Sequence, residues 1–258
     1  MEGDFRLYYT EQGSGEALVL LHGNGEDGTY FSQQTAYFSQ YFRVIAVDTR
    51  GHGKSPRGNA PFTLTQFAED LKVFLDALNL RRVLLLGFSD GGNIALLFTL
   101  KYPQYVRKLI LNGANLCPRG VRACVQVPIC IGYGICSFFA LFSGKAKANQ
   151  ELLRLMVKEP HIPAETAVAF AAAGAEGRAT AFIKPRVETL FGKYSRLTDE
   201  QKRFYDEIVA YAAAIPGSVL CFIDGDHFIA RNHPEAFHAA ADRFLRSETV
   251  SDQNHCQA

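Results

Sequence analysis

Four short apolar runs that lack polar alternation constrain the fold of this chain most strongly. They read ALVLL, RVIAV, VLLLGF and VRKLIL, and helical patterns or glycine-rich loops separate them. Strands buried on both faces give such continuous runs, and they belong to parallel sheets that helices cover on both sides. The pattern therefore predicts an α/β fold with a mostly parallel, doubly wound sheet, and the alternation in FRLYYTEQG adds an edge strand before it.

Length and charge limit the classes of function. The chain has 258 residues and 48% hydrophobic content, enough for one large domain with a substantial core. Its 27 basic residues face 26 acidic ones without a block of like charge, which argues against a nucleic-acid partner. No apolar run reaches the ~20 residues of a membrane span, and no signal-peptide pattern is visible. We expect a cytoplasmic protein, and the sequence gives no indication of its oligomeric state.

Cysteine and histidine spacing gives no sign of a metal or organic cofactor. The six cysteines include no CxxC pair, and their spacing matches no zinc or disulfide framework. We therefore expect reduced thiols that pack as small apolar side chains, and no cofactor.

One helix start is readable in detail. Thr63 and Gln66 have the spacing of a capping box, and Phe62 is placed to contact Phe67 as a hydrophobic staple. The apolar stripe that follows recurs at helical intervals and predicts a helix packed against the sheet.

The stretch GFSDGG, residues 87–92, places a serine between a buried strand and a helix. It satisfies the G-x-S-x-G pattern, in which glycines two positions before and after the serine allow a very sharp turn. The turn lifts the serine hydroxyl above the sheet edge, at the positive end of the following helix. An ordinary glycine-rich turn is the alternative, but the strand before and the helix after favour Ser89 as a nucleophile.

A serine that accepts an acyl group needs hydrogen-bond donors for the oxyanion. One donor is expected from the backbone N–H of Asp90, directly after the nucleophile. The second is expected from the N–H of Asn24, in the loop LHGNG after an earlier strand. Each such donor stabilises the transition state by about 2.7–4 kcal/mol.

These motifs together resemble those of the α/β-hydrolase fold family. HGNG, DTRGHGKS, GFSDGGNIAL and a late GDHF follow one another in the family's order. The run GFSDGGNIALLFTLKYPQYVRKLILNGAN is similar to the biphenyl-hydrolase-like branch, which includes valacyclovir hydrolases. The resemblance implies an α/β-hydrolase sheet with a helical cap insertion and a catalytic order of serine, acid and histidine.

Elimination among seven histidines selects the general base. The family uses residues like His22 and His52 structurally, and His161, His233, His238 and His255 have contexts that do not fit a base. His227 alone follows a buried strand, SVLCFID, inside a loop, and it comes last in the chain as the fold requires. We predict His227 as the base.

The catalytic acid is the least defined member of the site. In the family it follows the strand after the cap, some two dozen residues before the histidine. If AVAFAAAGAEG is that strand, Gly177 occupies the acid's place; if VETLFG is the strand, no acid follows until Asp199. Asp199 is therefore the candidate acid, although a favourable charge at a helix start is the simpler explanation of its position. Loss of the acid lowers kcat about 10⁴-fold.

Asp90 has a second interpretation through its side chain. In the valacyclovir-hydrolase-like branch, an acid at this position accompanies a preference for esters that carry a free α-amino group. Coulomb attraction to an ammonium group explains this in a dry pocket. The alternative is that Asp90 places negative charge at a helix N-terminus. Both remain open from the sequence.

The resemblance also divides the chain. Residues 1–116 and about 164–246 are expected to form the core, about 117–163 the cap, and 247–258 a disordered tail. A membrane-surface helix is the rival interpretation of the apolar segment, since its phenylalanines stand near Lys145 and Lys147. We prefer the cap, which needs the same apolar surface.

Two classes of function follow. The first is a serine hydrolase of small carboxylic esters or related acyl compounds, which forms an acyl-enzyme on Ser89. The second is a catalytically impaired protein of the same fold that binds a ligand or partner, and the missing acid is its only support.

Overall fold

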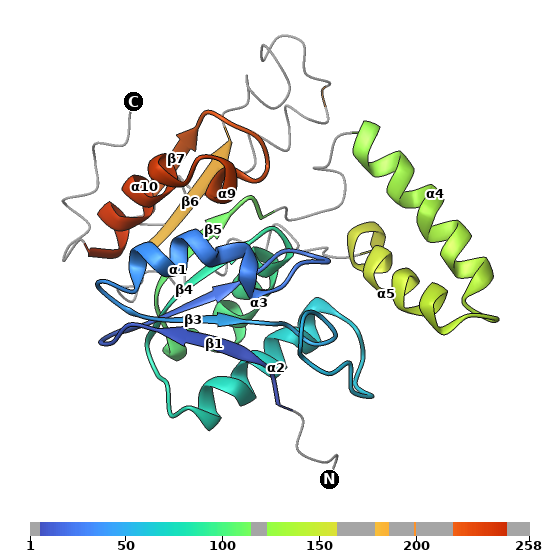
Figure 1. The fold of residues 1–258 in the computed structure, drawn as a ribbon, viewed down its shortest axis with the longest axis horizontal. Helices are drawn as coiled ribbons and strands as arrows, with labels where there is room; N and C mark the ends of the chain where they lie inside the picture. The colour runs from blue at the N-terminus through green and yellow to red at the C-terminus, as the bar shows by residue number, and fades with distance from the viewer. Residues whose placement is uncertain (1–5, 115–122, 159–178, 186–198, 200–218, 247–258) are drawn as a thin grey trace.

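The computed structural model describes residues 6–114, 123–158, 179–185, 199 and 219–246. Within them, seven strands form one sheet in the order β1-β3-β2-β4-β5-β6-β7 (Figure 1). β1 is antiparallel to β3, and every other pair is parallel. The mostly parallel sheet and the edge strand are therefore confirmed. The strands are β1 Tyr9–Gln12, β2 Ala17–Leu21, β3 Arg43–Val47, β4 Val83–Phe88, β5 Val106–Asn112, β6 Ala179–Pro185 and β7 Val219–Ile223.

Helices cover both faces of the sheet because alternate strand residues point to opposite sides. Val19 and Leu85 pack with α2 and α3, whereas Leu18 and Leu84 pack with α1, α9 and α10. Both faces are buried, which explains why the strands read as continuous apolar runs. The helices are α1 Ser32–Phe38, α2 Leu64–Ala77, α3 Asp90–Lys101, α4 Ala123–Phe139, α5 Gly144–Lys158, α9 Ile229–Asn232 and α10 Pro234–Arg246, with 3-10 turns at Gly28–Phe31 and Pro103–Tyr105.

The predicted start of α2 is confirmed, with one difference. The Thr63 side chain accepts a hydrogen bond from the N–H of Gln66 at 3.1 Å, and the rings of Phe62 and Phe67 meet at 4.9 Å. The Gln66 amide does not return to Thr63; it donates to Asp70 Oδ1 at 3.0 Å. The Gln66 side chain is thus bonded to Asp70, one turn further along α2, whereas in a capping box it would accept the backbone N–H of Thr63.

Helices α4 and α5 form a hairpin between β5 and β6 in the chain (Figure 1). α5 is attached to the sheet side of the molecule: Leu155 is buried, and Arg57 forms a two-bond ion pair with Glu151 at 2.9 and 2.8 Å. None of the helices in the described ranges is long and apolar enough to cross a bilayer. The expected division into core, cap and tail stays a prediction, and residues 247–258 lie outside the described part.

The strand that follows the hairpin differs from both sequence alternatives. β6 is Ala179–Pro185, which pairs with β5 and β7, and it lies between AVAFAAAGAEG and VETLFG in the chain. Those two segments fall outside the described residues. The parallel partners on both sides fix this strand, and its sequence, ATAFIKP, has too few consecutive apolar residues to be recognised alone.

Candidate active site

The turn between β4 and α3 has the geometry that the glycine pattern predicts. Ser89 has φ of 51° and ψ of −118°, a conformation that non-glycine residues rarely adopt. A Cβ at Gly87 would overlap the backbone of Gly91, and a Cβ at Gly91 would overlap the carbonyl of Leu21. The two glycines are therefore steric requirements of the turn.

Backbone hydrogen bonds hold the strained serine in place. Its N–H donates to the carbonyl of Asn112 at 2.9 Å, and its carbonyl accepts from the N–H of Gly92 at 2.9 Å. A residue in such a sparsely populated conformation is destabilised by about 1–3 kcal/mol and persists only when its surroundings fix it. Strain of this kind occurs most often at functional sites, and here it exposes the hydroxyl at the carboxyl edge of the sheet.

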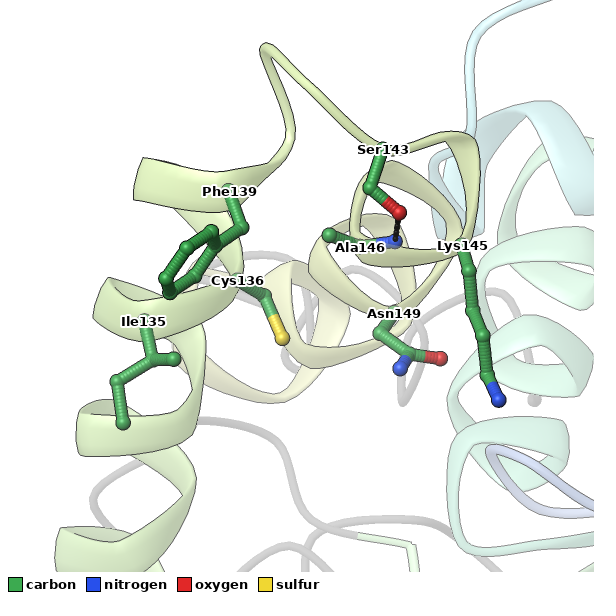
Figure 2. Close-up of a pocket in the computed structure, with 7 residues that line it drawn as sticks. All are labelled: Ile135, Cys136, Phe139, Ser143, Lys145, Ala146 and Asn149. Carbon is green, nitrogen blue, oxygen red and sulfur yellow. Dashed lines mark hydrogen bonds between the residues drawn. The ribbon is translucent and has the colours of Figure 1, made fainter.

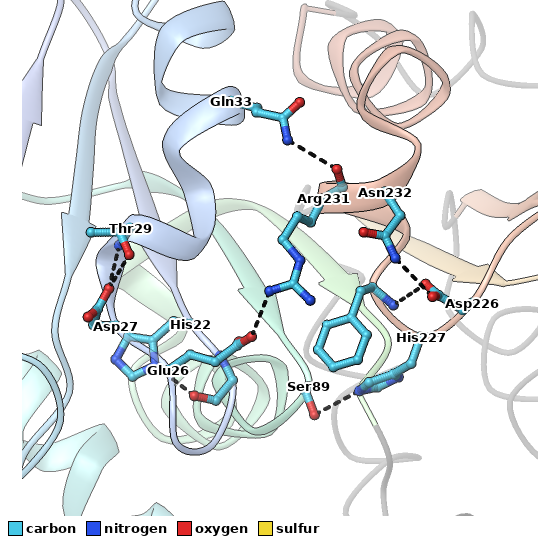
Figure 3. Close-up of polar contacts among 12 residues, drawn as sticks. His22, Glu26, Asp27, Thr29, Gln33, Ser89, Asp226, His227, Arg231 and Asn232 are labelled. Atoms are coloured by element: carbon cyan, nitrogen blue, oxygen red, sulfur yellow. Dashed lines mark hydrogen bonds and ion pairs between the residues drawn. The ribbon is translucent and has the colours of Figure 1, made fainter.

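The structure brings Ser89 and His227 together from opposite ends of the chain. Nε2 of His227 lies 3.1 Å from Oγ of Ser89, within hydrogen-bond distance (Figure 3). His227 lies in the loop between β7 and α9, and its imidazole packs against Phe88, with the two ring centroids 4.9 Å apart. This pair is the arrangement that a serine nucleophile and its general base require.

Gly113 leaves room for the imidazole, a requirement that the sequence analysis missed. It has φ of 63°, and a Cβ there would lie 3.0 Å from Cε1 and 3.2 Å from Nδ1 of His227. Only a residue without a side chain permits both the backbone turn and the position of the ring. The available signal was the Asn-Gly pair that ends β5, which is typical of a tight turn.

Substitution of Gly113 by alanine is expected to displace the imidazole. We expect kcat/KM for ester hydrolysis to fall about 10²-fold, because a misplacement near 1 Å has an effect of that order. Gly15→Ala is the matched control. Gly15 also has positive φ, but the nearest atom to a Cβ there is the carbonyl oxygen of Tyr41, 3.8 Å away. Gly15 precedes β2, at the opposite end of that strand from the loop that contains Asn24. Both variants should lose similar thermal stability. Full activity of Gly113→Ala would show that the imidazole does not depend on this space.

The loop after β2 contains Asn24, the predicted source of an oxyanion donor. Its side-chain amide donates to the carbonyl of Leu152 at 2.9 Å and so connects the loop to α5. No motif in the sequence points to this link. The expected role of its backbone N–H stays a prediction, but the side chain fixes the loop against the helical hairpin.

Glu26 joins this loop to the histidine loop. Its Oε2 accepts the N–H of Gly23 at 3.2 Å, and its Oε1 lies 3.9 Å from the guanidinium of Arg231 (Figure 3). Burial raises the pKa of the Glu26 carboxyl, while the Gly23 hydrogen bond and Arg231 oppose that shift. No motif in the sequence points to Glu26.

His22 and His52 are buried beneath the loops at this edge of the sheet. Nδ1 of His22 lies 2.7 Å from the carbonyl of Gly23, and its Nε2 accepts the N–H of Thr49 at 3.0 Å. Burial lowers the pKa of His22, and it lowers that of His52 to about 4. Both imidazoles are therefore neutral at neutral pH, and His22 connects the loops that follow β2 and β3.

Asp90 is the first residue of α3, so its backbone N–H lies at the positive end of that helix. Its side chain is buried, and Oδ1 accepts from the Asn93 amide at 3.2 Å. This contact explains the position of the carboxylate within the first helical turn. Recognition of a substrate ammonium by Asp90 stays a prediction.

The described residues do not identify the catalytic acid. Asp199 is described as an exposed residue in helical conformation, whereas residues 186–198 and 200–218 lie outside the described part. Asp226, next to His227, accepts from the N–H of Phe228 at 2.8 Å and from the Asn232 amide at 2.9 Å. It thereby stabilises the loop that carries the histidine. Among the described residues, no cluster of three potential ligands for a metal ion occurs.

Comparison with known proteins gives a consistent result. A family model described as the alpha/beta hydrolase fold matches residues 16–127. The human serine hydrolase BPHL is 39% identical over 118 residues, which cover 43% of this chain and 40% of that protein. A 2-hydroxy-6-oxo-6-phenylhexa-2,4-dienoate hydrolase from Comamonas testosteroni is 33% identical over 166 residues, which cover 60% and 53% of the two chains. The match thus spans about half or less of these relatives.

Similarity in three dimensions extends over more of the chain. The crystal structure of an enol-lactonase from Burkholderia xenovorans matches with a TM-score of 0.67 and 19% identity. The match covers 93% of this chain and 96% of that one. At this level of identity the comparison shows the fold alone, and the predicted fold class is confirmed.

Proposed function

We propose that this chain, which has the α/β-hydrolase fold, is a serine hydrolase of small carboxylic esters or related acyl compounds. The observation that carries the proposal is the 3.1 Å contact between Oγ of Ser89 and Nε2 of His227. A strained serine beside an imidazole, at the carboxyl edge of a parallel sheet, is the arrangement that acyl transfer needs.

The proposed reaction has two halves. Oγ of Ser89 attacks the ester carbonyl as its proton passes to Nε2 of His227, and the alcohol then leaves with that proton. Water next gives a proton to the same nitrogen and attacks the acyl-enzyme, which releases the carboxylic acid and restores the serine. The N–H groups of Asn24 and Asp90 would hold the oxyanion in both halves, each contributing about 2.7–4 kcal/mol to stabilisation of the transition state.

The relatives support the reaction class more than the substrate. One is named a serine hydrolase and another a hydrolase of a 2-hydroxy-6-oxo-dienoate. Because the matches span only part of each relative, the ester substrate rests on the chemistry of the Ser89–His227 pair. The cytoplasmic location also stays a prediction.

Labelling with a fluorophosphonate probe tests the proposal. The probe reacts covalently with an activated serine, so we expect rapid labelling of the wild-type chain and none of Ser89→Ala. Circular dichroism of both proteins controls for folding. If the well-folded wild-type chain is not labelled, the hydrolase proposal is wrong and a ligand-binding protein of the same fold is favoured.

The same assay assigns the acid, which we propose as Asp199. Asp199→Asn should slow labelling and lower kcat by up to about 10⁴-fold, because the imidazole loses its orienting partner. Glu188→Gln is the comparison, since Glu188 is the first acidic residue after β6 in the sequence. Slowing in Glu188→Gln alone would move the acid from Asp199 to Glu188.

A further inference from the structure

A row of large apolar side chains lies exposed on the helical hairpin. Positions 127, 131, 135 and 138 follow one another at helical spacing, which places them on one side of α4, and position 142 lies in the turn that follows the helix. Their exposed fractions range from 55% to 78%. We call this set the apolar ridge: Val127, Ile131, Ile135, Phe138 and Phe142.

The ridge lies on the peripheral helix of the hairpin. Helix α5 makes the contacts to the rest of the molecule through Leu155 and Glu151, while α4 packs on α5 at the periphery (Figure 1). A hairpin that serves only to cover a site buries its apolar face inward. Here one helix is used for attachment, and the other presents apolar surface outward.

Positive charge accompanies the ridge. Lys145 and Lys147, in the first turn of α5, are both exposed. The sequence has no acidic residue between Asp90 and Glu151, so the whole tip of the hairpin is apolar and cationic. The overall composition is balanced, whereas this stretch, which runs from α3 through β5 to the start of α5, has no acidic residue.

A hollow of about 330 Å³ opens between the two helices at the same end (Figure 2). Ile135, Cys136 and Phe139 line it from α4, and Lys145 stands at its α5 side. Apolar walls with a cation at the edge suit a hydrocarbon chain that ends in a negatively charged group.

We propose that the tip of the α4–α5 hairpin binds the surface of a membrane that contains anionic phospholipids. Apolar side chains on such a helix enter the boundary between headgroups and acyl chains, and adjacent lysines meet the lipid phosphates. A second copy of the chain is a poorer occupant, because its ridge offers no acidic residue to meet Lys145 and Lys147. The binding uses none of the residues assigned to catalysis, and it goes beyond the proposed hydrolysis.

The absence of tryptophan from the sequence provides a clean reporter. Phe138→Trp places a single tryptophan on the ridge, where its side chain is 67% exposed in the native chain. Vesicles of phosphatidylcholine and phosphatidylserine in equal amounts should shift its emission to shorter wavelength. In the same chain, Lys145→Gln with Lys147→Gln should weaken vesicle binding about 25-fold, since each lysine contributes about fivefold near an anionic surface.

Matched variants test whether vesicle binding depends on the ridge itself or on any exposed apolar side chain. Ile131→Asp should abolish co-sedimentation with these vesicles, whereas Val73→Asp, at an equally exposed position on α2, should leave it unchanged. Vesicle binding does not depend on catalysis, so it is informative even if the hydrolase proposal fails. Equal binding of all variants, no binding at all, or dimers without vesicles in sedimentation velocity would overturn the proposal.

Discussion

Ser89→Ala should lower kcat for ester hydrolysis about 10⁴- to 10⁶-fold, and adding His227→Gln should lower it little further. Nucleophile and base act as one unit at 3.1 Å, so removing either one eliminates the pathway that both serve. The measurement is kcat of the two single variants and the double variant with a chromogenic ester. Losses that multiply in the double variant would show that the two side chains act independently.

Stability provides a control for that experiment. Ser89→Ala keeps a side chain at φ of 51°, whereas Ser89→Gly removes the strain because glycine adopts this conformation freely. Ser89→Gly should therefore be inactive yet more stable than Ser89→Ala by about 1 kcal/mol in urea unfolding. A less stable glycine variant would contradict the view that the turn is strained.

Asp70→Asn should lower the free energy of unfolding by about 3–5 kcal/mol. Asp70 and Arg50 form two hydrogen bonds of 2.6 and 2.7 Å, and their side chains are only 5% and 4% exposed. Removal of one partner leaves a buried charge without its counterion, which is strongly destabilising. Urea denaturation of the purified variant gives the value directly.

Glu11→Gln is the matched control for burial. Glu11 and Arg43 also form two hydrogen bonds, both of 2.9 Å, but their side chains are 35% and 30% exposed. Water screens this pair, so its loss should change stability by about 0–1 kcal/mol. Equal effects of the two substitutions would show that burial is not what makes the Arg50–Asp70 pair important.

Predictions from the sequence were correct where residues close together in the chain decide the local structure. The cap at Thr63 and the sharp turn at Ser89 depend on residues within a few positions, and both form as predicted. Lys108 shows the opposite case, a charge in a buried strand. It donates to the carbonyls of Phe244 and Leu245 at the end of α10, more than 130 residues away in the chain. Burial lowers its pKa to about 8.

The sequence by itself determined the mostly parallel sheet, the positions of its first strands along the chain and the serine turn, because apolar patterning and glycine sterics act over short distances. Only the tertiary structure decided which segment becomes β6, why Gly113 has no side chain, and that Ser89 and His227 meet. Each of these depends on contacts between residues far apart in the chain, which local patterns do not encode.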